Sequence, residues 1–211
     1  TSPRGRGDVC SSIPVGFLRA IAVDIAPLRH SRRFRLLYIG QFISMFGTAI
    51  SYVVLPVQMY ALTHSSFAVG MLGVAEFVPT LALAFVGGAL ADAVDRRRLI
   101  VVCESGMTLC CVAMAVNAAQ PTPHAWLLFA TSAVVAGLNA VHRPALDALT
   151  PRLAALEHMP SVAALQAIRY STTFIIGPGL AGIIVSSLGA TVAYGLNAAT
   201  FLASLTAVSQ I

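Results

Sequence analysis

GGALADAVDRRRL, residues 87–99, ends a long apolar run with two aspartates and three consecutive arginines. The chain as a whole is poor in charge: 57% of its 211 residues are hydrophobic, 10% are charged and the mean hydropathy is +0.83. This composition excludes an ordinary soluble core and predicts a membrane protein. We therefore interpret the charges of this stretch as the point where the chain leaves the hydrocarbon.

The net charge of +5 comes from thirteen arginines, with no lysine, against eight acidic residues. A protein that reads nucleic acid clusters its arginines among stacking aromatic rings on a soluble fold. Here the arginines stand at the ends of apolar runs, as the positive-inside rule describes for cytoplasmic helix ends. We expect membrane lipid as a partner of this chain, and no nucleic acid.

Six apolar runs are each long enough to cross a bilayer, because about 20 residues at about 1.5 Å each span about 30 Å of hydrocarbon. Strands are excluded, since an open sheet edge would leave main-chain polar groups unsatisfied in lipid. The sequence predicts an all-α membrane protein in which residues 34–211 form a six-helix transmembrane bundle. The predicted helices are 36–61, 67–91, 99–118, 125–147, 162–186 and 190–209.

Arginines mark one side of this bundle. They occur in the N-terminal tail, residues 1–33, in the connection after residue 91, and at Arg152 before the fifth helix, whereas the other three connections hold none. The tail and these two connections are therefore predicted to be cytoplasmic. Within the tail, residues 17–30 are weakly amphipathic, and both an interfacial helix and a disordered segment remain open.

No residue pattern of an enzyme is present. The sequence contains no P-loop, no nucleophile and base at a recognisable spacing, and no CxxC metal spacing. Three of the four cysteines, Cys103, Cys110 and Cys111, lie within one apolar run and are predicted to be reduced packing residues. We expect no enzymatic activity, no metal and no cofactor.

The opening stretch resembles a motif of the major facilitator superfamily, G-x-L-A-D-R-x-G-R-[KR], found between the second and third helices of those transporters. Two positions differ, since Ala93 replaces a basic residue and Asp95 replaces a glycine. The six positions that agree are Gly88, Leu90, Ala91, Asp92, Arg96 and Arg97.

Further segments are similar to the branch of that superfamily that contains drug and siderophore exporters. They are LPVQMYALTHSSFAVG (55–70), GPGLAG (177–182) and AYGLNAATFLAS (193–204). The resemblance covers about residues 32–208. It implies the N-terminal six-helix half of a transporter in a bacterial inner membrane.

The resemblance also implies a conformational latch. Asp92 would cap a helix of the second six-helix half, and Arg96 would pair with an acid on the fourth helix. Asp147 is the acid in a suitable place, and a pair between Asp147 and Arg143, one turn earlier, is the alternative. The residues of the predicted latch are Gly88, Asp92, Arg96, Arg97 and Asp147.

Three charged side chains lie inside predicted helices, where an ionised group costs about 3 kcal/mol or more unless it has a partner or a task. Glu76 is the strongest candidate for a proton carrier, because a carboxyl group among apolar side chains favours its neutral form; a structural acid is the alternative. Glu104 is expected to have a structural role, in which it either extends to the inner membrane face or pairs with the arginines at 96–98. Arg169 is expected to pair with Glu104 or Glu76, or else to neutralise an anionic substrate. Gln41 is expected either to hydrogen-bond between helices or to line a cavity.

The fifth predicted helix contains Gly177, Pro178 and Gly182. Pro178 lacks the N–H that would bond to the carbonyl four residues earlier, which predicts a kink, and the glycines predict close packing. The segment is similar to the superfamily's antiporter signature, G-x-x-x-G-P-x-x-G-G, which implies export. The superfamily's arginine on the fourth helix is absent, because Ala133 occupies its place.

Transporters of this superfamily have two six-helix halves with the substrate site between them. This chain begins at Thr1 and stops at Ile211, so the simplest account is a piece of a chain about twice as long; a homodimer of halves is the alternative. We expect a secondary active exporter of a small amphipathic molecule, a siderophore or a drug. Its partners would be the substrate, protons and a missing C-terminal half. A transport-incompetent fragment or a helical interaction protein is the alternative function.

Overall fold

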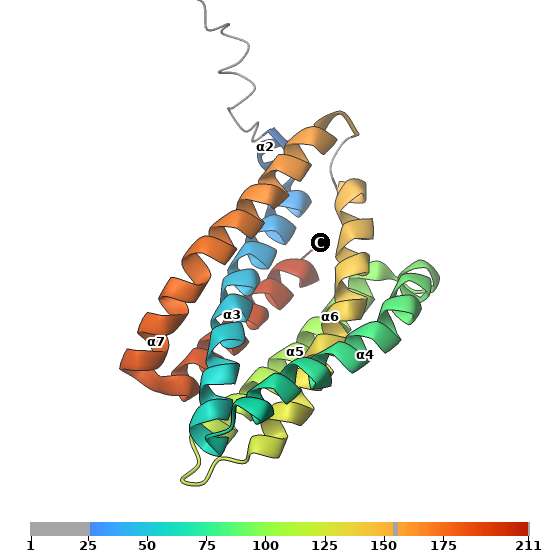
Figure 1. Ribbon diagram of the computed structural model, residues 1–211. Helices are drawn as coiled ribbons and strands as arrows, with labels where there is room; N and C mark the ends of the chain where they lie inside the picture. Colours follow the sequence, from blue (N-terminus) through green and yellow to red (C-terminus); the bar gives the residue numbers. More distant parts are fainter. Residues whose placement is uncertain (1–25, 154–155, 211) are drawn as a thin grey trace, which may run out of the picture.

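The computed structural model describes the backbone of residues 26–153 and 156–210, and the side chains of these ranges except 26, 85–93 and 156. Every element in the described ranges is helical (Figure 1), which confirms the predicted all-α fold. Most of the predicted tail, and of its segment 17–30, lies outside these ranges. The last residues of the segment 17–30 form the short helix α2, Ala26–His30.

Within the described ranges five helices are long and apolar enough to cross a membrane. The last of them contains two helices, because Gly189 adopts φ 81° and ψ 173° and interrupts the helical backbone. In Figure 1 the chain turns back at this point, so that α7 has two arms that cover the predicted helices 162–186 and 190–209. The elements after α2 are α3 (Arg32–Thr63), α4 (Ser66–Ala93), α5 (Arg96–Ala118), α6 (Ala125–Leu153), the 3₁₀ turn η1 (Leu156–His158) and α7 (Met159–Ser209).

Local signals explain where these helices begin and end. The hydroxyl of Ser31 accepts a hydrogen bond from the main-chain N of Phe34 at 3.2 Å, so α3 begins at Arg32, ahead of the predicted residue 36. The helix ends at His64, whose φ of 49° is left-handed. Helix α5 begins at Arg96 and α7 at Met159, each three residues ahead of the predicted start, and α6 continues past the predicted residue 147 through Pro151.

The helices pack in an order that differs from their order in sequence. Helix α3 lies against both arms of α7, α5 lies against α6 and α7, and α4 packs almost entirely on α6 (Figure 1). Only 6% of the most apolar part of α4 is buried within the chain, against 44% in α5. The bundle therefore leaves one face of α4 open.

Small residues allow α3 to approach the second arm of α7 closely. A Cβ atom added at Gly40 would lie 3.0 Å from Ala207 Cβ, and one added at Gly47 would lie 3.0 Å from Asn197 Cα. Because lipid gives little hydrophobic drive between helices, such close main-chain approach is a main source of association in a bilayer. The crossing of α3 and α7 is thus fixed by glycines.

We predict that Gly47→Ala destabilises the bundle by about 1–3 kcal/mol, because the new methyl group overpacks the contact with Asn197. The measurement is the fraction of protein that remains monodisperse on size exclusion after heating in detergent. Gly195→Ala is the matched control, since a Cβ there meets nothing within 4 Å. Equal melting of the two variants would contradict close packing at Gly47.

Candidate functional site

The arginines that close the opening stretch bind helix ends. Asp95 caps α5, because its carboxylate accepts hydrogen bonds from the main-chain N of Arg97 at 2.9 Å and of Arg98 at 3.2 Å. The guanidinium of Arg97 donates to the main-chain oxygens of Val208, at 3.1 Å, and Ser209, at the end of α7. Those carbonyls lack helical partners, so Arg97 satisfies them. The aspartate that departs from the superfamily motif therefore has a local structural role.

Arg96 contacts α6 beside the acid expected as its partner. Its Nη1 donates to the main-chain oxygen of Ala148 at 3.1 Å. In the described part of the chain Asp147 forms an ion pair neither with Arg96 nor with Arg143, so neither expected pair is present in this structure. Pro151 has no N–H for the main-chain oxygen four residues earlier, that of Asp147, so the last turns of α6 lack one helical hydrogen bond.

The other two latch residues, Gly88 and Asp92, lie on the last turns of α4. Their side chains fall outside the described residues. The backbone places them directly before the cap of α5, at the same end of the bundle as the start of α3 and the end of α6 (Figure 1).

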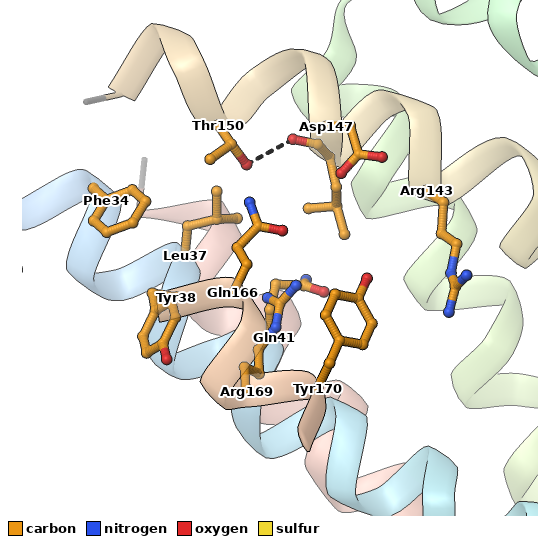
Figure 2. Close-up of a pocket in the computed structure, with 11 residues that line it drawn as sticks. Phe34, Leu37, Tyr38, Gln41, Arg143, Asp147, Thr150, Gln166, Arg169 and Tyr170 are labelled. Carbon is orange, nitrogen blue, oxygen red and sulfur yellow. Dashed lines mark hydrogen bonds between the residues drawn. The ribbon is translucent and has the colours of Figure 1, made fainter. Parts of the chain in front are cut away.

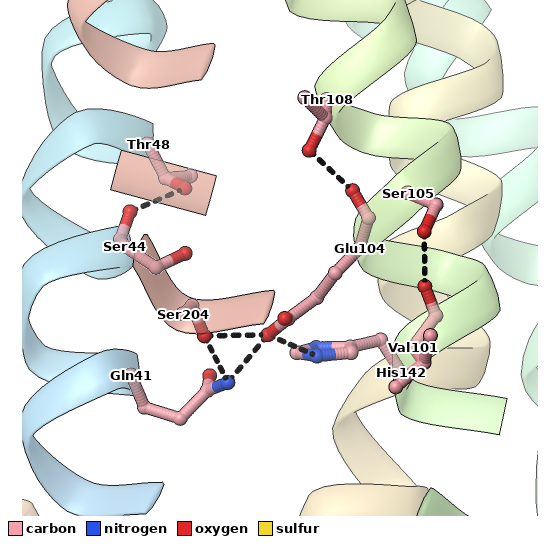
Figure 3. A network of polar contacts seen from close by, with 9 residues as sticks. All are labelled: Gln41, Ser44, Thr48, Val101, Glu104, Ser105, Thr108, His142 and Ser204. Atoms are coloured by element: carbon pink, nitrogen blue, oxygen red, sulfur yellow. Dashed lines mark hydrogen bonds and ion pairs between the residues drawn. The ribbon is translucent and has the colours of Figure 1, made fainter. Parts of the chain in front are cut away.

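A buried polar network surrounds Glu104, which is fully buried on α5 (Figure 3). Its Oε1 accepts hydrogen bonds from Gln41 Nε2 at 2.6 Å and from Ser204 Oγ at 2.8 Å. His142 Nε2 lies 3.3 Å from the same oxygen. Gln41 is on α3, His142 on α6 and Ser204 on the second arm of α7, so one oxygen joins four helices.

This network corrects the expected partners of Glu104. Neither the arginines at 96–98 nor Arg169 binds it in the described structure, because Glu104 points into the interior while Arg96 and Arg97 are occupied at helix ends. The partner that sequence reasoning missed is His142. Its signal was a histidine within an apolar run, directly before Arg143.

A pocket opens between α3, α6 and the first arm of α7 (Figure 2). It encloses about 30 Å³, which is room for one or two water molecules and far below a whole substrate site. Gln41 lines this pocket and also donates to Glu104, so the pocket and the buried network share a wall. The lining residues are Phe34, Leu37, Tyr38, Gln41, Arg143, Leu146, Asp147, Thr150, Gln166, Arg169 and Tyr170.

Arg169 lies in this pocket and not beside an acid. Its guanidinium carbon is 5.3 Å from the centroid of the Tyr170 ring, and its Nε is buried without a hydrogen-bond acceptor. The expected pairs of Arg169 with Glu104 or Glu76 are therefore absent from the described structure. Glu104 is engaged elsewhere, and Glu76 is on α4, which packs on α6 away from α7.

Glu76 is half-buried near the middle of α4. Among the described residues its carboxyl group has no hydrogen-bond or ionic partner, and Thr80 binds only its main-chain oxygen. Its neighbours Phe77 and Val78 are exposed apolar side chains. The structure thus leaves the carboxyl of Glu76 without a polar partner among the described residues, on the half-buried side of α4 that also carries Leu72 and Pro79.

The glycines of the first arm of α7 divide into two kinds. A Cβ at Gly177 would lie 2.7 Å from Ala49 Cβ on α3, which fits the predicted close packing, whereas Gly182 meets nothing within 4 Å. Pro178 lies inside a stretch with helical dihedral angles, and the break of α7 is at Gly189. The predicted close packing at Gly182 is therefore absent among the described residues.

We predict that Glu104→Ala lowers the free energy of unfolding by about 3 kcal/mol, because it leaves the buried groups of Gln41, Ser204 and His142 without their acceptor. Glu104→Gln keeps an acceptor oxygen and should cost less. Thermal unfolding in detergent measures both variants. Glu157→Ala is the control, since that side chain is 79% exposed. Equal stability of Glu104→Ala and the control would refute a structural role of the network.

Comparison with known proteins gives this geometry a context. Residues 22–211 match the family described as transmembrane secretion effector. The chain is 29% identical over 188 residues to the enterobactin exporter EntS of Salmonella typhi, covering 87% of this chain and 44% of that protein. It is 28% identical over 192 residues to the enterobactin exporter EntS of Citrobacter koseri, covering 89% and 45%.

The chain therefore spans a little under half the length of the curated relatives that it matches. The family match covers most of the chain, including every helix from α3 to the second arm of α7. The chain belongs to the transmembrane secretion effector family of the major facilitator superfamily, and is a multi-pass membrane protein of a transporter family, not an enzyme.

Proposed function

We propose that this chain is the N-terminal half of a secondary active exporter that moves a small amphipathic molecule out of the cell in exchange for protons. The observation that carries this proposal is the match of 87% of the chain to 44% of an exporter. A six-helix bundle of the superfamily matches one of the two halves between which such transporters bind their substrate.

The open face of α4 supports a second half as the partner. An apolar groove runs along this face and is lined by Phe67, Met71, Val74 and Val78 of α4, with Phe129 of α6. Gly182, on the first arm of α7, likewise has open space around it. We propose that the C-terminal six-helix half covers these surfaces and that lipid covers the rest.

The distribution of arginines supports a cytoplasmic N-terminus. Arg96, Arg97 and Arg98 begin α5 and Arg152 ends α6, at the end of the bundle where α3 starts. The positive-inside rule assigns this end to the cytoplasm. The pocket containing Arg169 then faces the side from which an exported molecule enters.

The relatives' name supports a substrate class. They are enterobactin exporters, and we propose for this chain a siderophore or a drug-like amphipathic molecule. The pocket of this half offers polar and aromatic side chains together, which suits a molecule with both characters.

We propose that the opening stretch acts as the latch between states. Arg96 of α5 binds the main-chain oxygen of Ala148, which directly follows Asp147 on α6. A small rearrangement would therefore exchange that oxygen for the carboxylate of Asp147. Asp92 would cap a helix of the second half while that exchange holds the outward-facing state. Gly88 and Arg97 complete the stretch, and Arg97 fixes its position through the end of α7.

The proposed function predicts that cells lacking the protein secrete less siderophore or become more sensitive to amphipathic drugs. Restoring the protein should restore export, and restoring Asp92→Asn should not, although the variant reaches the membrane in equal amount. The readouts are secreted siderophore, growth with drug and protein abundance. No effect of the deletion would favour a transport-incompetent protein, and full export by Asp92→Asn would refute the latch.

We predict that Glu76→Gln abolishes proton-driven export while substrate binding is retained, because the amide cannot carry a proton from its apolar site. The measurement is export driven by an imposed pH gradient in vesicles of the cells that make the protein. Glu157→Gln is the control, as an exposed acid outside the bundle's interior. A normal response of Glu76→Gln to the pH gradient would exclude it as the carrier.

A further inference from the structure

Two arginines from different helices approach one aromatic ring. The guanidinium carbon of Arg143, on α6, lies 6.0 Å from the centroid of the Tyr170 ring, and that of Arg169, on α7, lies 5.3 Å from it. Figure 2 shows the Tyr170 side chain between the two arginines. The face of a tyrosine ring attracts a cation, but this attraction offsets only a small part of the charge of two guanidinium groups.

Neither arginine forms an ion pair with an acid within the part of the chain that the structure describes. Arg169 is half-buried ten residues into α7, and its Nε is fully buried without an acceptor. A buried guanidinium N–H without a partner is costly, so this atom is suited to an acceptor from outside the chain.

The charged residues that line the pocket carry one more positive charge than negative, which one negative group would balance. Asp147 lines the same pocket and offsets one of the two positive charges. Arg143 and Asp147 are exposed at its mouth, whereas Arg169 lies deeper. The remaining positive charge is therefore available to an anion that enters from the open side.

The other walls of the pocket suit an aromatic group. Phe34 and Tyr38 of α3 stand opposite Tyr170 of α7, and the hydroxyl of Tyr38 donates to the main-chain oxygen of Leu165 at 2.9 Å. This bond holds α3 against α7, so the aromatic side chains are fixed in place. The enclosed space of about 30 Å³ is small, so only a small charged group would enter it and an attached ring would lie toward the mouth.

We propose that Arg143 and Arg169 form a binding subsite for the negatively charged group of an aromatic anion, with Tyr170 packed between them. The inference rests on the proposed function, because it assigns a charge to the exported molecule. Arg169 supplies the deep hydrogen-bond donor, Arg143 supplies the donor at the mouth, and a planar guanidinium matches a carboxylate with paired hydrogen bonds.

Binding of benzoate to the purified chain tests this subsite. The chain is placed in nanodiscs of zwitterionic phosphatidylcholine, so that no lipid headgroup supplies a net negative charge, and calorimetry records the heat of binding. Benzoate is expected to bind and neutral benzamide to bind at least about tenfold more weakly. Equal binding of the two compounds, or no binding of benzoate, would overturn the subsite.

Substitutions connect the binding to the two arginines. Arg169→Gln and Arg143→Gln are each expected to raise the dissociation constant of benzoate by about tenfold or more. Arg152→Gln, an exposed arginine outside the pocket, is the matched control and should change nothing. Arg143 is exposed, so its variant tests the subsite even where Arg169→Gln fails to fold. Unchanged benzoate affinity in folded Arg143→Gln would overturn the assignment.

These measurements need no gradient and are independent of transport. Arginine-dependent benzoate binding by a protein that exports nothing would refute the proposed function and leave the subsite standing. Export of amphipathic cations by a protein that does not bind benzoate would overturn the subsite and leave the proposed export standing.

Discussion

One carboxylate oxygen, Oε1 of Glu104, connects four helices of this bundle. Gln41, His142 and Ser204 approach it from α3, α6 and the second arm of α7. Lipid chains are as apolar as the helix surfaces, so burial alone does little to choose one arrangement of helices in a bilayer. A buried carboxyl group with three polar partners does favour one arrangement of the helices, because any other arrangement would leave these groups unsatisfied in a medium without water. The positions of the remaining side chains follow from this arrangement.

The same requirement for satisfied polar groups acts at the ends of the helices. Arg97 binds the last carbonyls of α7, Arg96 binds a carbonyl of α6, and Asp95 caps the start of α5. Three helix ends are thereby held together by one short charged segment. Farther into the bundle, Gln41 links the Glu104 network to the pocket, since its side chain both donates to Glu104 and forms part of the pocket wall.

The helices could be predicted from the sequence because their cause is local. An apolar run of sufficient length has to satisfy its own main chain in lipid, and a helix is the only single-segment solution. The partners of Glu104 could not be predicted in this way, because they lie 63, 38 and 100 residues away along the chain. Which of these residues meet is decided by the crossing of α3 and α7 at Gly40 and Gly47, and nothing in a single run of sequence specifies that crossing. For the same reason the sequence could not decide between the alternatives for Arg169, and the two pairs with Glu104 and Glu76 are absent from the described structure.

Polar satisfaction also separates two kinds of charge that look alike in the sequence. Glu104 and Arg97 are charged residues in or next to apolar runs, and the chain supplies hydrogen-bond partners for Arg97 and for Oε1 of Glu104, while Oε2 of Glu104 has none among the described residues. Arg169 and Glu76 are placed similarly, yet the described chain supplies no acid for Arg169 and no polar partner for the carboxyl of Glu76. A half-buried charge is costly unless something stabilises it, so both side chains call for a group that the described residues do not supply. A substrate, a proton or a second six-helix half would each meet this need.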